Sequence, residues 1–318
     1  MSLTKQQLHG VWVAMVTPWD EAQGAPRRDV LARLADRFAQ AGVNGLFILG
    51  NTGEGALLSP EERRCFTEAV LQEVKEKLPV IVHTGHDRTS VAVELAVHAK
   101  TVGAFAVAVS APARYRLDES ELEAHFVEVA QALGDFPMLL YDVPSTTGNP
   151  LSATLLIRIS AQAFNVVGIK VSRPDWEAWE QYLALTKSMA IFVGTDTLCL
   201  PMLMMGASGI ISGPANVLPE LYVQLYYAIR EKNFDKAKEC QNLINQLCRI
   251  IHNGVPLAFI KQGLKLTSYD VGYPLKPLRH LLPDEYEELQ KNLLTLVNKF
   301  NLFAKGVVFR EEKPSILR

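Results

Sequence analysis

The chain has 318 residues, of which 48% are hydrophobic and 21% are charged. This length allows one large domain or two ordinary ones, and single (β/α)8 barrels are commonly of this size. The 32 basic and 34 acidic residues leave a net charge of −2. That balance excludes the basic excess typical of nucleic-acid-binding proteins, so no nucleic-acid partner is expected.

The compartment is predicted from what the sequence lacks. Residues 1–10 have no apolar segment typical of a secretory signal, and no apolar run reaches the ~20 residues that a membrane span needs. The cysteines show neither CxxC nor Cys/His metal spacing; they are Cys65, Cys199, Cys240 and Cys248. Such cysteines are typical of reduced thiols in a packed core. We therefore expect a soluble, cytoplasmic protein with no membrane partner.

Short apolar runs alternate along the chain with segments of helical periodicity. The runs are residues 11–16, 45–49, 80–82, 105–109, 138–141, 166–170, 191–193 and 209–211. The helical segments are 29–40, one from Ser59-Pro60, 89–100, 120–132, one from Ser152, one from Pro174-Asp175, and 198–205. This alternation predicts βαβ units and a parallel sheet, and eight units favour a closed (β/α)8 barrel over an open doubly wound sheet. No GxGxxG follows the first run, which disfavours a dinucleotide-binding sheet.

Beyond the eighth run the pattern is only helical, over residues 218–230, 234–251 and 283–300. This helical tail is too long to be a single helix that closes the barrel. We therefore predict a barrel over residues 1–217 and a C-terminal helical extension over 218–318 that packs on the barrel as an additional layer. From Lys305 onward we expect an irregular extension.

Active sites of such barrels lie at the carboxyl ends of the strands. Lys170 ends the run 166–170, where burial can lower the pKa of its amine and make the neutral nucleophile accessible. Tyr141 ends the run 138–141 and could carry protons if it points toward Lys170. Taken singly, each has a simpler interpretation: a lysine that reaches solvent, and a core tyrosine whose hydroxyl is satisfied.

The turn GNTGEG (50–55) can direct backbone amides toward one point, which favours an anion. Because it lacks the GK[ST] ending of a Walker A loop, a carboxylate is favoured over a nucleotide phosphate, although a plain turn is the alternative. His83 and His86, three residues apart in a turn with no third ligand, indicate no metal site. An anion-binding turn, a tyrosine and a lysine together indicate Schiff-base chemistry on a 2-keto acid, in which the iminium acts as an electron sink and no cofactor is needed.

Five motifs in order carry a resemblance to a known family: GNTGEG (50–55), YDVPSTTG (141–148), GIK (168–170), GTD (194–196) and GASGIIS (206–212). Over about residues 8–294 the chain resembles the dihydrodipicolinate synthase/N-acetylneuraminate lyase family of class I aldolases. The resemblance implies a (β/α)8 barrel with added C-terminal helices. It also implies a homotetramer, as a dimer of dimers, and pyruvate held on Lys170 as a covalent Schiff base, without metal or other cofactor.

The resemblance further implies roles for individual residues. Tyr141 would be the proton donor and acceptor, and Thr52 would bind the pyruvate carboxylate through its hydroxyl and amide, within a loop that also holds Asn51 and Gly53. The other predicted substrate-binding positions are the backbone carbonyl of Ile211, which would line the pyruvate site, and Gly194 and Asp196, which would meet the second substrate.

Three departures from the family pattern bear on the second substrate. Asn51 stands where the family usually has a threonine or serine, and Arg114, next to Tyr115, stands at the position of a relay tyrosine. Thr146 replaces the arginine that binds the aldehyde's carboxylate in the synthases. The loss of that arginine costs about 1.5–3 kcal/mol of binding per charged hydrogen bond, unless Arg114 replaces it.

These departures favour a retro-aldolase or dehydratase that cleaves or forms a pyruvate adduct such as a 2-keto-3-deoxy sugar acid. The main alternative is a 4-hydroxy-tetrahydrodipicolinate (dihydrodipicolinate) synthase that condenses pyruvate with aspartate semialdehyde. A noncatalytic keto-acid-binding protein on the same scaffold and a metal-dependent aldolase are the remaining alternatives.

Overall fold

Eight parallel strands form a closed barrel in the computed structural model, which describes residues 7–74, 76–300 and 309. The strands are β1 (Gly10–Ala14), β4 (Gly45–Ile48), β5 (Val80–His83), β6 (Ala106–Ser110), β7 (Met138–Asp142), β8 (Val166–Val171), β9 (Ala190–Val193) and β10 (Gly209–Ser212). They follow one another around the barrel in chain order, and β10 pairs with β1 to close it. Each predicted apolar run forms one of these strands, so the predicted (β/α)8 barrel is confirmed.

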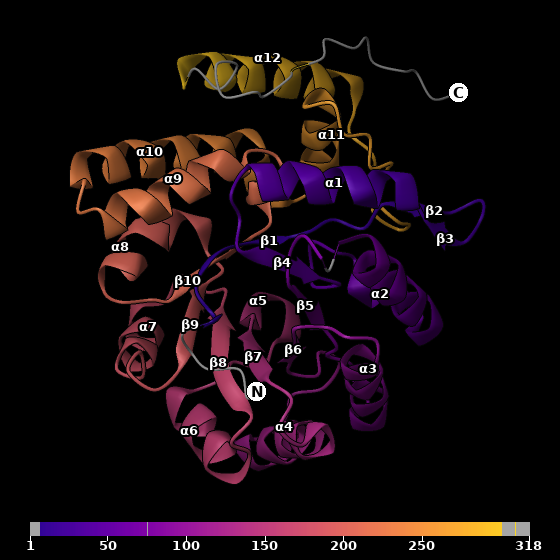
Figure 1. The fold of residues 1–318 in the computed structure, drawn as a ribbon, viewed down its shortest axis with the longest axis vertical. Coiled ribbons are helices and arrows are strands. Elements are labelled where there is room, and N and C mark those ends of the chain that lie inside the picture. Colours follow the sequence, from indigo (N-terminus) through magenta and orange to yellow (C-terminus); the bar gives the residue numbers. More distant parts are fainter. Residues whose placement is uncertain (1–6, 75, 301–308, 310–318) are drawn as a thin grey trace.

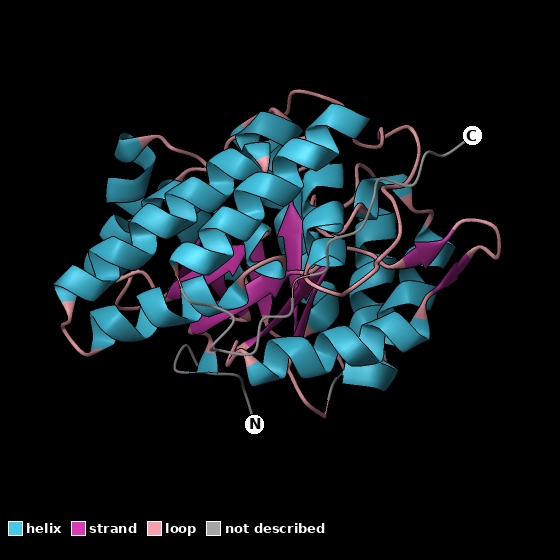
Figure 2. Ribbon diagram, turned by 90° about the horizontal axis from the view of Figure 1, so that it is seen from above, coloured by secondary structure: helices cyan, strands magenta, loops and turns pink. Residues whose placement is uncertain are grey.

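The barrel strands are buried on both faces, as expected of a parallel sheet covered by helices. Their side chains alternate between the barrel interior and the helical layer. The interior is filled by a cluster that includes Trp12, Phe47, Leu139, Phe192 and Ile211. Figure 2 shows the strands enclosed by helices on all sides.

Helices follow the strands and cover the barrel (Figure 1). They are α1 (Arg28–Gln40), α2 (Pro60–Val74), α3 (Thr89–Thr101), α4 (Glu119–Leu133), α6 (Ala153–Gln162), α7 (Trp176–Leu183), α8 (Cys199–Met204) and α9 (Pro219–Arg230). The predicted helix start at Ser59 is confirmed. The Glu62 amide donates to the Ser59 hydroxyl at 3.2 Å, and the Ser59 amide donates to the Glu62 carboxylate at 2.7 Å. This reciprocal capping satisfies two amides that the helix leaves free.

Three more helices, coloured orange to yellow in Figure 1, lie together on one side of the barrel. They are α10 (Phe234–Ile250), α11 (Ala258–Leu266) and α12 (Pro283–Lys299). The additional C-terminal helical layer is therefore confirmed, and its apolar residues belong to the same core cluster as the outer face of the barrel. The division of the chain after residue 217 stays a prediction. The extension predicted from Lys305 lies, apart from Phe309, outside the described residues.

Helix α11 and several short elements were not predicted. The short elements are a hairpin of β2 (Trp19–Asp20) and β3 (Ala25–Pro26), helix α5 (Pro144–Thr147), and the 3-10 turns η2 (Gly55–Leu57), η3 (Asp196–Leu198), η4 (Pro214–Asn216) and η5 (His252–Gly254). None of these short elements spans enough residues to show a clear helical or strand periodicity in the sequence. The turns η2, η3 and η4 and helix α5 follow barrel strands, so they shape the loops at the carboxyl end.

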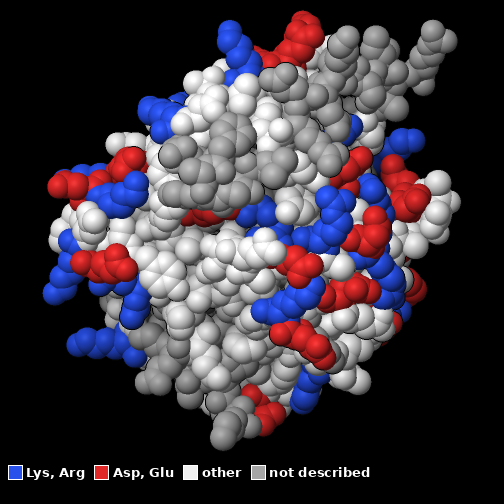
Figure 3. All heavy atoms as spheres, turned by 45° about the horizontal axis from the view of Figure 1, so that its top comes forward, with Lys and Arg blue, Asp and Glu red and all other residues white. Residues whose placement is uncertain are grey.

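The surface mixes both signs of charge. On the face shown in Figure 3, basic and acidic side chains lie interspersed instead of gathering by sign. No helix in the described part of the chain is long and apolar enough to cross a membrane.

Candidate active site

Lys170 and Tyr141 lie side by side inside the barrel. Strands β7 and β8 pair in register with Tyr141 opposite Lys170, so both side chains point to the same face. The Lys170 Nζ lies 4.3 Å from the centre of the Tyr141 ring and 4.4 Å from that of Phe47. Lys170 and Tyr141 are only 5% and 4% exposed, so Lys170 is not the lysine that simply reaches solvent at the end of its strand.

Burial shifts the pKa of both groups. It lowers the pKa of the Lys170 amine to about 7, because the charged form is poorly solvated, while the charge of Asp196 opposes the change. Burial likewise raises the pKa of Tyr141 to about 12, against the effect of a hydrogen bond with Ser172. Near neutral pH the lysine is therefore available as a neutral nucleophile and the tyrosine keeps its proton.

A glycine makes room for the lysine stem. A Cβ atom on Gly194, directly after β9, would lie 2.1 Å from the Ser172 hydroxyl oxygen and 3.0 Å from the Lys170 Cε. Any side chain at this position would displace one of these groups. The GTD motif thus places its glycine against the proposed nucleophile.

The GNTGEG loop follows β4 and folds back on itself. The amides of Glu54 and Gly55 donate to the carbonyls of Asn51 and Gly50 at 3.1 and 3.3 Å. The left-handed conformations belong to Leu49 (φ 61°) and Glu54 (φ 55°), whereas the glycines are needed for space. A Cβ on Gly55 would lie 1.9 Å from the Leu49 carbonyl oxygen.

The loop meets two other loops at the barrel mouth. The Thr52 hydroxyl lies against Gly213, directly after β10, at 2.6 Å from where a Cβ would stand. The Asn51 amide nitrogen donates to the Thr146 hydroxyl at 2.8 Å, which joins the loops after β4 and β7. Ile211, predicted to line the pyruvate site, is buried in β10. The structure thus gathers these predicted residues, with Gly53, at one end of the barrel.

Asp196 completes the side of the site opposite Tyr141. The Ser212 hydroxyl donates to its carboxylate, and the Gln241 side chain donates to its backbone carbonyl at 3.0 Å. Burial raises the pKa of the carboxylate, and the charge of Lys170 opposes this change. Asp196 is therefore close enough to Lys170 for each group to affect the protonation of the other.

His83 joins the same cluster, a placement that sequence reasoning missed. Its Nδ1 lies 3.1 Å from the Leu49 carbonyl, which only accepts, so Nδ1 carries the proton and Nε2 accepts from the Ser110 hydroxyl at 3.1 Å. Its ring packs edge-on against Tyr141 at 5.7 Å between centroids. Burial lowers the pKa of His83 to about 3, so the ring is neutral. The sequence signal that could have found His83 is its position directly after a strand run. In the structure the His83 ring supports Leu49, the residue with a left-handed backbone at the entrance of the GNTGEG loop.

Arg114 and Arg116 belong to the same loop after β6 but lie in different surroundings. Arg114 is 75% exposed, with its Nε 4.0 Å from an Asp87 carboxylate oxygen. The guanidinium of Arg116 instead lies against the YDVPSTTG loop, 3.1 Å from where a Cβ on Gly148 would stand. Arg116 was not singled out by sequence, although it lies two residues from Arg114 in the same loop. Among the described residues, no group of three or more His, Cys, Asp or Glu could hold a metal ion.

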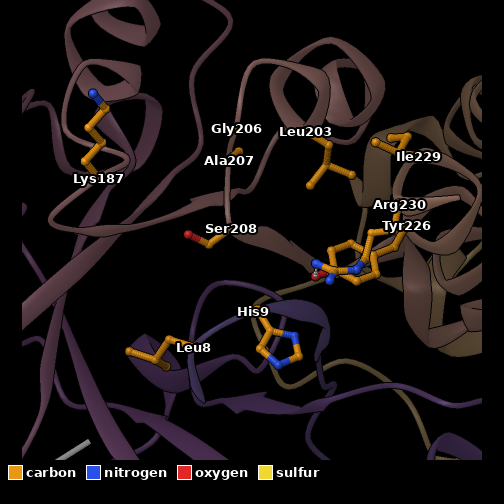
Figure 4. Close-up of a pocket in the computed structure, with 10 residues that line it drawn as sticks. All are labelled: Leu8, His9, Lys187, Leu203, Gly206, Ala207, Ser208, Tyr226, Ile229 and Arg230. Atoms are coloured by element: carbon orange, nitrogen blue, oxygen red, sulfur yellow. Dashed lines mark hydrogen bonds between the residues drawn. The ribbon is translucent and has the colours of Figure 1, made fainter. Parts of the chain in front are cut away.

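A cavity of about 830 Å³ lies at the opposite end of the barrel (Figure 4). It is lined by residues that precede strands, such as His9 before β1 and Ser208 before β10, and by Arg230, which covers the Tyr226 ring at 5.8 Å. None of the predicted site residues lines it. The site is therefore assigned to the mouth at the carboxyl ends and not to this cavity.

A barrel with a buried amine and a buried phenol at the carboxyl ends of its strands suits a lyase that works through a Schiff base. Comparison with known proteins agrees: residues 7–296 match the Dihydrodipicolinate synthetase family. The chain is 36% identical over 289 residues to an uncharacterized DapA-like lyase of Halobacterium salinarum, covering 91% of this chain and 94% of that one. It is 32% identical to the 4-hydroxy-tetrahydrodipicolinate synthase of Methanopyrus kandleri, covering 94% and 99%.

Solved structures are similar as well. The crystal structure of YagE, an Escherichia coli K12 prophage protein of the dihydrodipicolinic acid synthase family in complex with pyruvate, superposes with a TM-score of 0.85. Its sequence identity is 26%, and the match covers 91% of this chain and 98% of that one. The chain belongs to the dihydrodipicolinate synthetase family, and the resemblance read from its motifs is confirmed.

Proposed function

We propose that this chain is a class I lyase that forms a Schiff base between Lys170 and a 2-keto acid, and that it cleaves or forms a pyruvate adduct such as a 2-keto-3-deoxy sugar acid. The observation that carries the proposal is the buried Lys170 amine, opposite Tyr141 in the ladder, with a pKa of about 7. The lyase class of the family supports it.

The chemistry uses the neutral amine and the protonated tyrosine. The Lys170 amine attacks the ketone carbon, and loss of water leaves an iminium that withdraws electrons from the adjacent carbon. Cleavage of the carbon–carbon bond then releases an aldehyde and leaves an enamine, which is protonated and hydrolysed to pyruvate. Tyr141 donates and accepts the protons, and the positive iminium beside its ring favours the phenolate when the proton has left.

Residues of the mouth would hold the substrate. Thr52 binds the pyruvate carboxylate through its hydroxyl and amide, with Gly53 and Asn51 in the same loop, and the Ile211 carbonyl lines the pyruvate site. Gly194, Asp196, Thr146 and Arg114 are the proposed positions that meet the second substrate. No metal or other cofactor takes part, and full activity after EDTA treatment would exclude a metal-dependent aldolase.

The test is borohydride reduction in the presence of pyruvate. We expect a mass increase equal to one reduced pyruvate adduct, mapped to Lys170, and no increase in a Lys170→Ala variant. An unmodified wild-type protein would contradict the proposal and leave a noncatalytic keto-acid binder as the interpretation.

A 4-hydroxy-tetrahydrodipicolinate synthase is the second candidate, and the Methanopyrus kandleri relative of that name favours it. Thr146 argues against it because threonine cannot pair with a carboxylate as arginine does. A panel of 2-keto-3-deoxy acids, sialic acid, and pyruvate with aspartate semialdehyde distinguishes the two. Efficient condensation with aspartate semialdehyde would make the synthase the better assignment.

We also propose that the enzyme works in the cytoplasm as a homotetramer, a dimer of dimers, with small-molecule substrates as its ligands. Neither a nucleic acid nor a membrane is a proposed partner.

A further inference from the structure

Helix α11 sends a fully buried lysine toward the GNTGEG loop. The Lys261 side chain has no exposed surface, and its Nζ lies 2.6 Å from a carboxylate oxygen of Glu54, which is equally buried. The ammonium also donates to the backbone carbonyls of Thr17 at 3.0 Å and Tyr273 at 2.8 Å. The ammonium therefore has one ion-pair partner and two carbonyl acceptors, the kind of pairing that a buried charge requires.

These contacts fix the part of the loop that precedes η2. Glu54 has a left-handed backbone (φ 55°), which a residue with a side chain adopts only when its surroundings hold it there. Its other carboxylate oxygen accepts from the Leu275 amide at 2.6 Å. The Thr17 hydroxyl donates to the Gly53 carbonyl at 2.6 Å, so Lys261 also holds Gly53 through Thr17.

The neighbouring residue extends this support to the far side of the site. Ile260 lies 3.6 Å from where a Cβ on Gly213 would stand, and the Thr52 hydroxyl lies against that same glycine. Helix α11 thus contacts both the loop that holds Thr52 and Gly213, the residue against which the Thr52 hydroxyl rests.

We propose that Lys261 is a positioning residue for the substrate carboxylate: through Glu54 and Thr17 it holds residues 52–54 in the conformation that binds the carboxylate of the 2-keto acid. The inference rests on the proposed function, since it concerns the carboxylate of the ketone that forms the Schiff base. It assigns Lys261 no contact with the reacting atoms.

Two ketones separate this role from a general effect on the fold. Pyruvate uses both Lys170 and the carboxylate loop, whereas acetone lacks the carboxylate and uses only Lys170. The first variant is Lys261→Met. We expect the pyruvate concentration that gives half-maximal borohydride labelling to rise about tenfold or more. This is the change in affinity expected when a charge-assisted hydrogen bond is lost. The rate of labelling with acetone should stay at the wild-type value.

Two further variants guard against misfolding. Glu54→Gln/Lys261→Met removes both charges, so no unpaired charge stays buried, and it should show the same selective loss for pyruvate. Arg37→Met is the matched control, because it breaks another largely buried ion pair, with Glu220, that links α1 and α9 away from the site. It should leave labelling by both ketones unchanged.

Wild-type half-saturation by pyruvate in the folded Lys261 variants would overturn the proposal. So would an equal loss with acetone, or failure of both Lys261 variants to fold, because each would show a role in the whole structure. If the wild-type protein is labelled by neither ketone, the proposed function itself fails.

Discussion

The environment of Lys170 sets the pH range in which the enzyme should work. Its pKa of about 7 predicts that borohydride labelling with pyruvate rises with pH through a midpoint near 7, because only the neutral amine attacks. The charge of Asp196 opposes the lowering of this pKa, so Asp196→Asn should move the midpoint to lower pH. The measurement is the labelling rate from pH 5 to 10. A midpoint near the ordinary lysine value of about 10.5 would contradict a desolvated amine.

The Tyr141 hydroxyl is the other residue whose chemistry can be isolated. Tyr141→Phe keeps the ring that packs against Phe47 and His83 but removes the proton carrier, so turnover should fall by about 10²-fold or more. Tyr182→Phe is the matched control, since the Tyr182 hydroxyl lies outside the barrel interior, 2.7 Å from the Leu151 carbonyl and 3.2 Å from an Asp142 carboxylate oxygen. Steady-state kinetics on both variants decides. Full activity of Tyr141→Phe would remove the proton-transfer role.

At the scale of elements, the spacing of β8 and β9 depends on Gly168. It lies opposite Ala190 in the ladder, and a Cβ there would stand 2.2 Å from the Ala190 carbonyl oxygen. Gly168→Ala should therefore force the strands apart, lower the free energy of unfolding by about 1–3 kcal/mol or more, and reduce turnover by displacing Lys170. Urea unfolding and kinetics test this. Val167→Ala, which removes atoms and leaves the spacing intact, should keep turnover, and an unaffected Gly168→Ala variant would refute the argument.

Elements also show what the sequence could and could not predict. The eight strands were predictable because each is an apolar run between turn residues, and Lys170 and Tyr141 followed from their positions at strand ends. Helix α11 was missed because it contains Gly263 and follows Pro256 closely. The Glu54–Lys261 pair was missed for a different reason: periodicity describes neighbours in the chain, and it carries no information on which distant side chains meet.

At the scale of the whole molecule, the proposed homotetramer has a direct consequence in solution. We expect a mass four times the 35.3 kDa of the chain, with dissociation to dimers before monomers on dilution, as a dimer of dimers requires. Light scattering after size-exclusion chromatography measures this. A single species at the mass of one chain would contradict the proposed assembly.

The place of α11 in the chain bears on how the protein is made. Ribosomes release Lys170, Tyr141 and the GNTGEG loop well before they release Lys261, because α11 follows all eight barrel strands. A nascent chain that has completed the barrel therefore holds every proposed catalytic group, but Glu54 has no cation to neutralise it. Selectivity for a keto acid over a simple ketone should thus appear late in synthesis, only when the C-terminal helices dock.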